Sequence, residues 1–135
     1  HSLSARQIVH LWQGLHTIAL ATVTKNNEPR VAPIGAVLFH GRFYIPTVLT
    51  AARTRHIMCS PAISFTYYQE NDLAVIVHGE AIIIPADNPA FFDVGLFLQE
   101  TSGQNIGEWD QGIFLEITPT TLYTFVRYPS HYSEG

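Results

Sequence analysis

Residues 45–57 have the sequence Ile-Pro-Thr-Val-Leu-Thr-Ala-Ala-Arg-Thr-Arg-His-Ile, and within this stretch a strand pattern changes into a helix pattern. The aromatic and β-branched residues of the segment 42–45 predict a strand. Thr50 is a suitable N-cap and Ser60-Pro61 a suitable stop, so a short helix is predicted over residues 50–59. We therefore expect the chain to leave a strand here, form one short helix, and enter another strand.

Outward from this stretch, runs of apolar and β-branched residues predict about seven strands, which are mostly linked by hairpins. His40-Gly41 is suited to the tight turn between two of them. The absence of regular strand–helix alternation disfavours a doubly wound fold. The sequence therefore predicts a mainly β (α+β) fold, an antiparallel barrel of six to seven strands with peripheral helices, in a single domain over residues 1–135. The expected strands cover residues 18–24, 30–39, 42–45, 62–69, 73–84, 113–118 and 122–127.

Two further helices are predicted from capping signals. Ser4 and Gln7 form a capping-box pattern, which predicts a helix over residues 4–15. Asn88-Pro89 starts another helix, which we expect to run to about Glu100. The polar loop that follows, residues 101–111 with Trp109, is long for so compact a domain and is interpreted as a functional lid.

Composition narrows the class of protein. Charged residues make up only 13% of the chain, about half the roughly 25% of an ordinary soluble domain, and burial in a homodimer interface would explain this deficit. The scattered basic residues do not predict nucleic-acid binding, and no apolar run has the length of a membrane helix. No basic leader precedes the first apolar stretch, so a cytoplasmic location is expected. The histidines and the single Cys59 lack metal-ligand spacing, so no metal site is expected.

Anion binding is predicted where the strand before residue 50 gives way to a helix. Hydroxyl groups at Thr47 and Thr50 lie close in sequence to the guanidinium groups of Arg53 and Arg55. Helix N-termini favour anions, and arginine binds phosphate oxygens through several donors at once. This set of residues therefore predicts a phosphate site. The alternative interpretation is that both arginines are solvated or ion-paired on the helix surface.

The order of several motifs resembles that of the pyridoxamine 5'-phosphate oxidase-like split-barrel flavoproteins. The motifs are Ile18-Ala-Leu-Ala-Thr-Val-Thr24, Asn27-Glu-Pro-Arg-Val-Ala-Pro33, Gly41-Arg-Phe-Tyr-Ile-Pro-Thr47, Ala51-Ala-Arg-Thr-Arg-His-Ile57 and Val77-His-Gly-Glu-Ala81. The resemblance implies a split barrel and a homodimer with an FMN in each groove between the subunits.

The resemblance also implies roles for individual residues. Thr47 and Arg53 would hold the flavin phosphate, and Arg55 would occupy a second basic position. Backbone groups of Pro33, Ile34 and Gly35 would lie beside the isoalloxazine ring. No family motif gives a role to Trp109, which we expect, from its place on the predicted lid loop, to cover the ring from the partner chain.

The chain departs from the oxidase itself at the substrate anchor. The C-terminal Arg-x-His-x-Arg element is absent, and Tyr128-Pro-Ser-His131 does not replace it, so vitamin B6 oxidase activity is not expected. We interpret the chain as an FMN-dependent oxidoreductase acting on an unidentified small molecule. An F420-dependent reductase of the same fold and a non-catalytic flavin- or haem-binding protein are alternatives. No catalytic side chain stands out, and structural roles are favoured for His78 and Tyr44.

Overall fold

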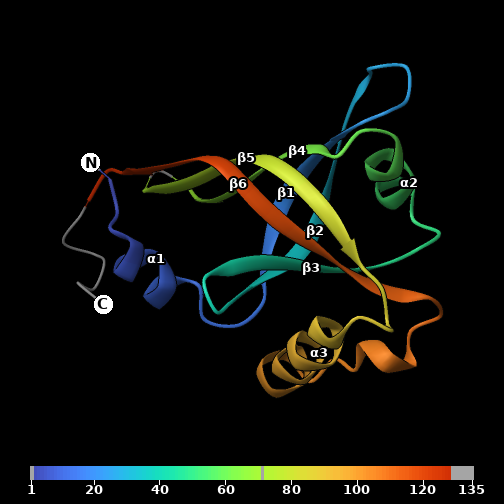
Figure 1. Ribbon diagram of the computed structural model, residues 1–135. Coiled ribbons are helices and arrows are strands. Elements are labelled where there is room, and N and C mark those ends of the chain that lie inside the picture. Colours follow the sequence, from blue (N-terminus) through green and yellow to red (C-terminus); the bar gives the residue numbers. More distant parts are fainter. Residues whose placement is uncertain (1, 71, 129–135) are drawn as a thin grey trace.

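Six antiparallel strands form a closed barrel in the order β1-β2-β3-β6-β5-β4 (Figure 1). The structure, a computed structural model, describes residues 2–70 and 72–128. The predicted antiparallel barrel with peripheral helices is confirmed. The strands are β1 (His16–Val23), β2 (Pro29–Phe39), β3 (Arg42–Val48), β4 (Ala62–Gln69), β5 (Leu73–Ile84) and β6 (Gly112–Val126). The helices are α1 (Ala5–Leu11), α2 (Ala52–Cys59), α3 (Pro89–Ser102) and the short 3-10 helix η1 (Ile106–Glu108).

The last strand differs from the sequence prediction, which placed a turn at residues 118–120 between two strands. Residues 112–126 form the single strand β6 instead. Pro119 lies at a β-bulge of this strand. His78 of β5 pairs with Thr121 and the next residue, Gly79, pairs with Pro119, so one residue of β6 is left without a partner. A side chain on Gly79 would collide with the Thr118 carbonyl oxygen, so a glycine is needed at this close approach. The bulge accommodates a proline that has no N–H to donate to the ladder.

The first helix is capped as predicted but ends earlier than expected. Ser4 and Gln7 form both hydrogen bonds of the capping box. The helix stops at Leu11 rather than residue 15, because Trp12 turns into the barrel, where it is 2% exposed. Its indole Nε1 donates to the Ala36 carbonyl oxygen at 3.1 Å. Burial of this large side chain therefore outweighs the helical period that continues in the sequence.

For the other two predicted helices, the predicted start of α3 is confirmed and the predicted start of α2 is wrong. Asn88 caps α3 through its side chain with Pro89 in the first turn, as predicted. The N-cap of α2 is Ala51, which makes no side-chain hydrogen bond, so the prediction that Thr50 caps this helix is wrong. Residues 50 and 51 connect the end of β3 to α2, so the helix begins at Ala52.

Two apolar clusters hold the fold together. The first fills the barrel, where Trp12 from the α1 end and Ile57 from α2 join side chains of all six strands. The second lies between α3 and the outer surface of β2, β3 and β6, and its fully buried members include Leu98 and Phe114. Figure 1 shows α1 and α2 at opposite ends of the barrel and α3 along its side. None of the helices in the described residues has the length and apolar character needed to cross a membrane.

Candidate functional site

A groove of about 260 Å³ opens between α2 and the hairpin formed by β1 and β2. The register of the hairpin pairs Thr22 with Arg30 and Leu20 with Ala32, so these side chains lie on the same side of it. The helix closes the groove from the opposite side. The lining residues are Leu20, Thr22, Arg30, Val31, Ala32, Ala52, Arg53 and His56.

The structure brings Arg53 and Thr47 together. Thr47 is the second-last residue of β3 and is 3% exposed. The Nη1 atom of Arg53 donates to Thr47 Oγ1 at 2.9 Å. The guanidinium is therefore held at the wall of the groove rather than extended into solvent.

The local fold explains why Arg53 turns back toward β3. The Thr54 hydroxyl, which is fully buried, donates to the Val48 carbonyl oxygen at 2.8 Å. The Ala51 backbone N–H donates to the same carbonyl at 3.2 Å. These bonds fasten the first turn of α2 to the end of β3, and the side chain one residue before Thr54 then reaches Thr47.

Arg55 and Thr50 lie apart from this contact. Arg55 Nη1 donates to the Thr50 carbonyl oxygen at 2.6 Å, and both residues are exposed. Neither residue lines the groove. Arg55 therefore agrees with the alternative interpretation of a solvated arginine, whereas half-buried Arg53 does not.

The groove is positively charged because its lining holds two arginines but no carboxylate. Among the described residues, neither Arg53 nor Arg55 forms an ion pair. Arg30 reaches Glu28 at 3.6 Å, where both side chains are more than half exposed. In a chain whose formal net charge is −4, this local excess of cations favours an anionic ligand.

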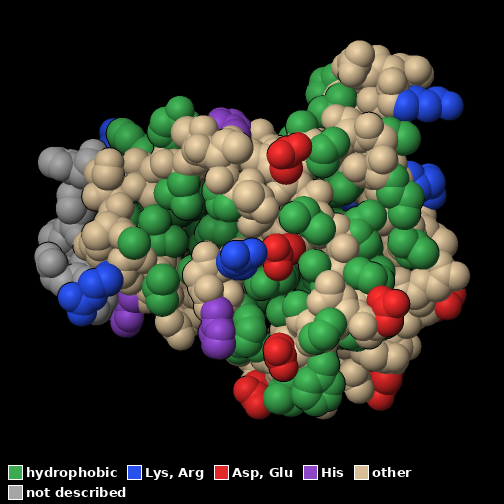
Figure 2. Space-filling view, viewed as in Figure 1, with side chains coloured by type: hydrophobic (Ala, Val, Ile, Leu, Met, Phe, Trp, Pro, Cys, Tyr) green, Lys and Arg blue, Asp and Glu red, His purple; other side chains and the backbone are tan. Residues whose placement is uncertain are grey.

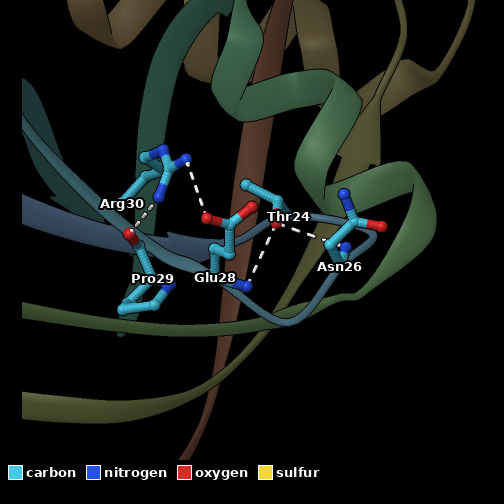
Figure 3. A network of polar contacts seen from close by, with 5 residues as sticks. All are labelled: Thr24, Asn26, Glu28, Pro29 and Arg30. Carbon is cyan, nitrogen blue, oxygen red and sulfur yellow. Dashed lines mark hydrogen bonds and ion pairs between the residues drawn. The ribbon is translucent and has the colours of Figure 1, made fainter.

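The tip of the hairpin is ordered by its own hydrogen bonds, which Figure 3 shows. The Thr24 hydroxyl accepts from the backbone N–H groups of Asn26 at 3.3 Å and Glu28 at 3.1 Å. Arg30 Nη1 donates to the Pro29 carbonyl oxygen at 2.9 Å. This network positions Arg30 at the edge of the groove.

Sequence reasoning missed three residues of the groove, namely Thr22, Arg30 and His56. Thr22 Oγ1 lies 2.8 Å from His56 Nδ1, and Thr22 is 4% exposed. Two signals could have identified this pair. Thr22 is a polar residue in the alternating buried positions of β1, and His56 follows Arg53 by three residues, on the same face of a helix.

The predicted ring-binding segment, Pro33 to Gly35, continues β2 beyond Ala32 at the end of the groove lining. Its strand pairs with β1 on one side, but β2 pairs with β3 only from Val37 to Phe39. The backbone of residues 33–35 therefore has no neighbouring strand on its second side among the described residues. A Cβ on Gly35 would stand 2.8 Å from Leu15 Cδ1, so Leu15 covers this glycine.

The loop predicted to be a lid is packed against its own chain. The α3 helix extends to Ser102, and Gly103 ends it with a φ of 77°. Ile106 of η1 is 3% exposed, and half-buried Trp109 packs on the α3 cluster. Trp109 does not line the groove of its own chain. Its contact with the ring of a partner stays a prediction.

The two candidate acid–base side chains lie outside the groove. Tyr44 is 6% exposed, and its hydroxyl donates to Glu116 Oε2 at 2.9 Å. Burial, with a smaller contribution from Glu116, raises the pKa of Tyr44 to about 12. His78 Nδ1 lies 2.6 Å from Ser64 Oγ on the exposed outer surface of β4 and β5. The described residues contain no group of three His, Cys, Asp or Glu side chains that could hold a metal ion.

The sequence profile of the family named pyridoxamine 5'-phosphate oxidase matches residues 4–112. The matched part includes β1 to β5 and the whole of α2, and therefore both Thr47 and Arg53. The chain therefore belongs to this family. No curated protein matches the sequence. Of the segment Tyr128-Pro-Ser-His131, residues 129–131 lie outside the described residues.

Solved structures show the same fold at low sequence identity. The heme storage protein HutZ from Vibrio cholerae is similar with a TM-score of 0.74 and 16% identity, over 90% of each chain. An FAD-binding protein from Mesorhizobium loti is similar with a TM-score of 0.70 and 16% identity, over 92% of this chain and 93% of that one. An F420 reductase is similar with a TM-score of 0.67 and 18% identity, over 84% and 93%.

Proposed function

We propose that this chain binds FMN in the groove between α2 and the β1–β2 hairpin, as a homodimer that carries out redox chemistry on a small molecule. The observation that carries the proposal is Arg53, which donates to Thr47 at 2.9 Å and lines a groove that has no carboxylate in its lining. Membership of the pyridoxamine 5'-phosphate oxidase family supports the choice of a flavin over other phosphorylated ligands.

Phosphate binding follows from the donors that remain available. A guanidinium has five N–H donors, and Thr47 accepts from one nitrogen of Arg53. No ion pair with a described residue uses the others. The first turn of α2 has no side-chain cap, which leaves the Ala52 and Arg53 N–H groups for a ligand oxygen, whereas the Thr54 N–H donates to the Ala51 carbonyl oxygen. Each charge-assisted hydrogen bond contributes about 1.5–3 kcal/mol to binding.

The remaining parts of the cofactor would lie along β2. The edge backbone of residues 33–35 offers N–H and C=O groups to the polar edge of an isoalloxazine ring. A bound flavin supplies hydride or electron transfer, while the protein orients the ring and sets its polarity. Thr22 holds His56 in place, and the Leu20 and Ala32 side chains provide the apolar part of the lining.

The outer surface of β4, β5 and β6 supports the homodimer. Three of its outward cross-strand rows contain no Asp, Glu, Lys or Arg, and the next row, Ala62–Glu80–Thr118, contains Glu80. Tyr68, Tyr123 and Phe125 are between 56% and 66% exposed there. Two copies meeting through the three uncharged rows about a twofold axis would bring no like charges together. The rows are Tyr68–Ala74–Phe125, Thr66–Ile76–Tyr123 and Ser64–His78–Thr121.

A cofactor with a longer anionic tail, such as FAD or F420, is the second candidate. The observation that favours it is Arg30, a second guanidinium contributed from β2 rather than from α2. The structural similarity to an F420 reductase and an FAD-binding protein supports the same alternative. FMN is preferred because Arg30 is exposed and already contacts Glu28 and Pro29.

The test is a titration of the protein with FMN, FAD, F420 and riboflavin, followed by absorbance and fluorescence. FMN should bind more tightly than riboflavin, which lacks the phosphate. Arg53→Ala should weaken FMN binding by about 1.5–3 kcal/mol, which is about 10- to 150-fold. Arg55→Ala is the matched control, because this arginine lies on the same helix outside the groove.

Equal affinity for FMN and riboflavin, or equal effects of the two arginine substitutions, would contradict the phosphate site. Tighter binding of F420 or FAD than of FMN, lost in Arg30→Gln, would favour the second candidate. Turnover with a nicotinamide donor and a quinone acceptor distinguishes an enzyme from a non-catalytic flavin carrier. Light scattering at micromolar concentration tests the dimer separately from the cofactor.

A further inference from the structure

The outward side of α3 carries an exposed apolar ridge, formed by Phe92 and Leu96. The helix buries Val94 and Leu98 against the barrel, where they are at most 1% exposed. Phe92 is 72% exposed and Leu96 is 48% exposed. Residues four apart lie one above the other on a helix, so the two side chains form one continuous strip.

A hollow lies on each side of the ridge, and Leu96 lines both of them. The larger one, of about 380 Å³, has Phe39 and His40 as its far wall and Asp93 and Glu100 at its edge. The smaller one, of about 150 Å³, lies between α3 and η1. The ridge therefore stands between two concave surfaces, which is a shape that an amphipathic segment can cover.

The surface around the ridge is acidic and is not neutralised within the chain. Residues 87–110 contain five carboxylates and neither Lys nor Arg. All five side chains are exposed, and none forms an ion pair with a described residue. Figure 2 shows Asp and Glu side chains gathered around hydrophobic ones at the α3 end of the molecule. The five are Asp87, Asp93, Glu100, Glu108 and Asp110.

The charges on α3 do not serve the helix itself. The first turn of α3 has no acidic residue and its last turn has no basic residue. Glu100 lies near the C-terminal end, where the helix dipole disfavours a negative charge. Phe92 likewise contributes nothing to the buried cluster. Two features that the fold does not use therefore occur together on one surface.

We propose that the α3 ridge binds a cationic amphipathic segment of another protein. Asp93 and Glu100 are seven residues apart, so they stand about 10 Å from one another along the helix on the same side of the ridge. A partner helix with leucine-like side chains on one face and Lys or Arg two turns apart would match both the apolar strip and this charge spacing. The proposal does not depend on flavin binding.

A second copy of the chain is a poorer occupant of the ridge. The same surface on two copies would place carboxylates opposite carboxylates, which is unfavourable in a twofold interface. The three uncharged cross-strand rows on the outer surface of β4, β5 and β6 do not have this problem. The charge of the ridge therefore selects a basic partner of different sequence.

The experiment uses a labelled helical peptide of leucine and lysine with all its lysines on one face, and fluorescence anisotropy as the readout. The control peptide has the same composition in a shuffled order without an apolar face. The amphipathic peptide should bind the protein, and the shuffled one should bind at least about tenfold more weakly. Raising the salt concentration should weaken the binding.

Two pairs of substitutions separate the apolar and charged contributions. Phe92→Ser with Leu96→Ser should weaken binding about tenfold or more. Asp93→Asn with Glu100→Gln should weaken it less and reduce its salt dependence. Glu70→Gln with Glu80→Gln removes the same charge elsewhere and should leave binding within about twofold. Because all six side chains are exposed, melting curves should show that the variants stay folded.

Equal binding of the two peptides would overturn the proposal. Equal losses in the ridge and control variants would overturn it too, since binding would then reflect net charge alone. A change from dimer to monomer on substituting Phe92 and Leu96 would assign the ridge to a second copy instead. FMN affinity, measured on the same variants, should not change.

Discussion

The helices α2 and α3 pack on the same barrel but carry charges of opposite sign. α2 holds Arg53, Arg55 and His56 without a carboxylate, and α3 holds Asp93 and Glu100 without a Lys or Arg. No Lys or Arg occurs between Arg55 and Arg127 in the sequence. Positive and negative charges are therefore separated in this chain, so that the α2 region favours anions and the α3 region favours cations.

The two helices also differ in how firmly their charged side chains are held. Arg53 is half buried and fixed by Thr47, at the wall of a groove. The carboxylates of α3 are exposed and form no ion pair with a described residue. A preorganised cation suits a small ligand of defined shape, whereas exposed surface charges suit a larger partner that covers them.

The largest expected effect is on the free energy of unfolding, and it compares a residue on the buried side of α3 with one on its exposed side. Leu98→Ala removes a fully buried side chain from the second cluster and should lower the free energy of unfolding by about 3–5 kcal/mol. Leu96→Ala, on the exposed ridge, should lower it by less than about 0.5 kcal/mol. Urea denaturation of both variants measures this difference. Similar losses would mean that the ridge is part of the structural core.

The next effect is a loss of stability at high pH on the α3 side of the barrel. Because burial and Glu116 raise the pKa of Tyr44 to about 12, the folded protein keeps this proton at a pH where the unfolded chain releases it. The unfolded state then binds fewer protons, so stability falls as pH rises from about 10 to 12, by about 2 kcal/mol.

Tyr44→Phe should remove this part of the pH dependence. The check is the free energy of unfolding of both proteins between neutral and strongly basic pH. All other titratable side chains are the same in the two proteins, so the difference between the curves isolates Tyr44. Parallel curves would show that Tyr44 does not hold its proton in the way its hydrogen bond to Glu116 implies.

A smaller effect tests how α2 is fastened to β3. Thr54→Val removes the buried hydrogen bond to the Val48 carbonyl and should destabilise the fold by about 1–2 kcal/mol. Thr101→Val on α3 is the matched control, because its hydroxyl bonds the Phe97 carbonyl on the exposed surface. That variant should stay within about 0.5 kcal/mol of the parent protein. Thermal unfolding of the pair provides the comparison.

The smallest effect follows from the proposed cofactor site. Thr47→Val removes the acceptor that orients Arg53 and leaves its charge in place. FMN affinity should fall by about 0.5–1 kcal/mol, well below the loss expected for Arg53→Ala. Fluorescence titration of the two variants side by side gives the ratio. A larger loss in Thr47→Val than in Arg53→Ala would show that the hydroxyl, rather than the guanidinium, binds the phosphate.

Much of the fold could be predicted because its signals are local. The bounds of β4 and β5 agree with the sequence prediction, and Asn88 marks the start of α3 through its own side chain. The errors arise where distant contacts compete with local patterns. Trp12 leaves its helix to fill the barrel, and Pro119 is carried through a strand because Gly79 on β5 makes room for it.

In the candidate site, too, contacts between residues close in sequence could be predicted, and contacts between distant segments could not. Thr47 and Arg53 are six residues apart, so a strand ending in a helix was enough to predict that they approach each other. Thr22, Arg30 and His56 meet only through the pairing of β1 with β2 and the packing of α2 over the hairpin. No pattern within one segment contains that information.

The position of β6 between β3 and β5 has a consequence for how the protein acquires its structure. Closing the barrel pairs Phe43 with Ile117 and Leu73 with Val126, so the last strand completes contacts with segments made much earlier. Such long-range pairing slows folding. Until β6 is in place, β3 and β5 each present an open edge that can pair with other chains. The chain is therefore protected from edge-to-edge aggregation only after β6, the strand that follows α3, has been synthesised and has paired with β3 and β5.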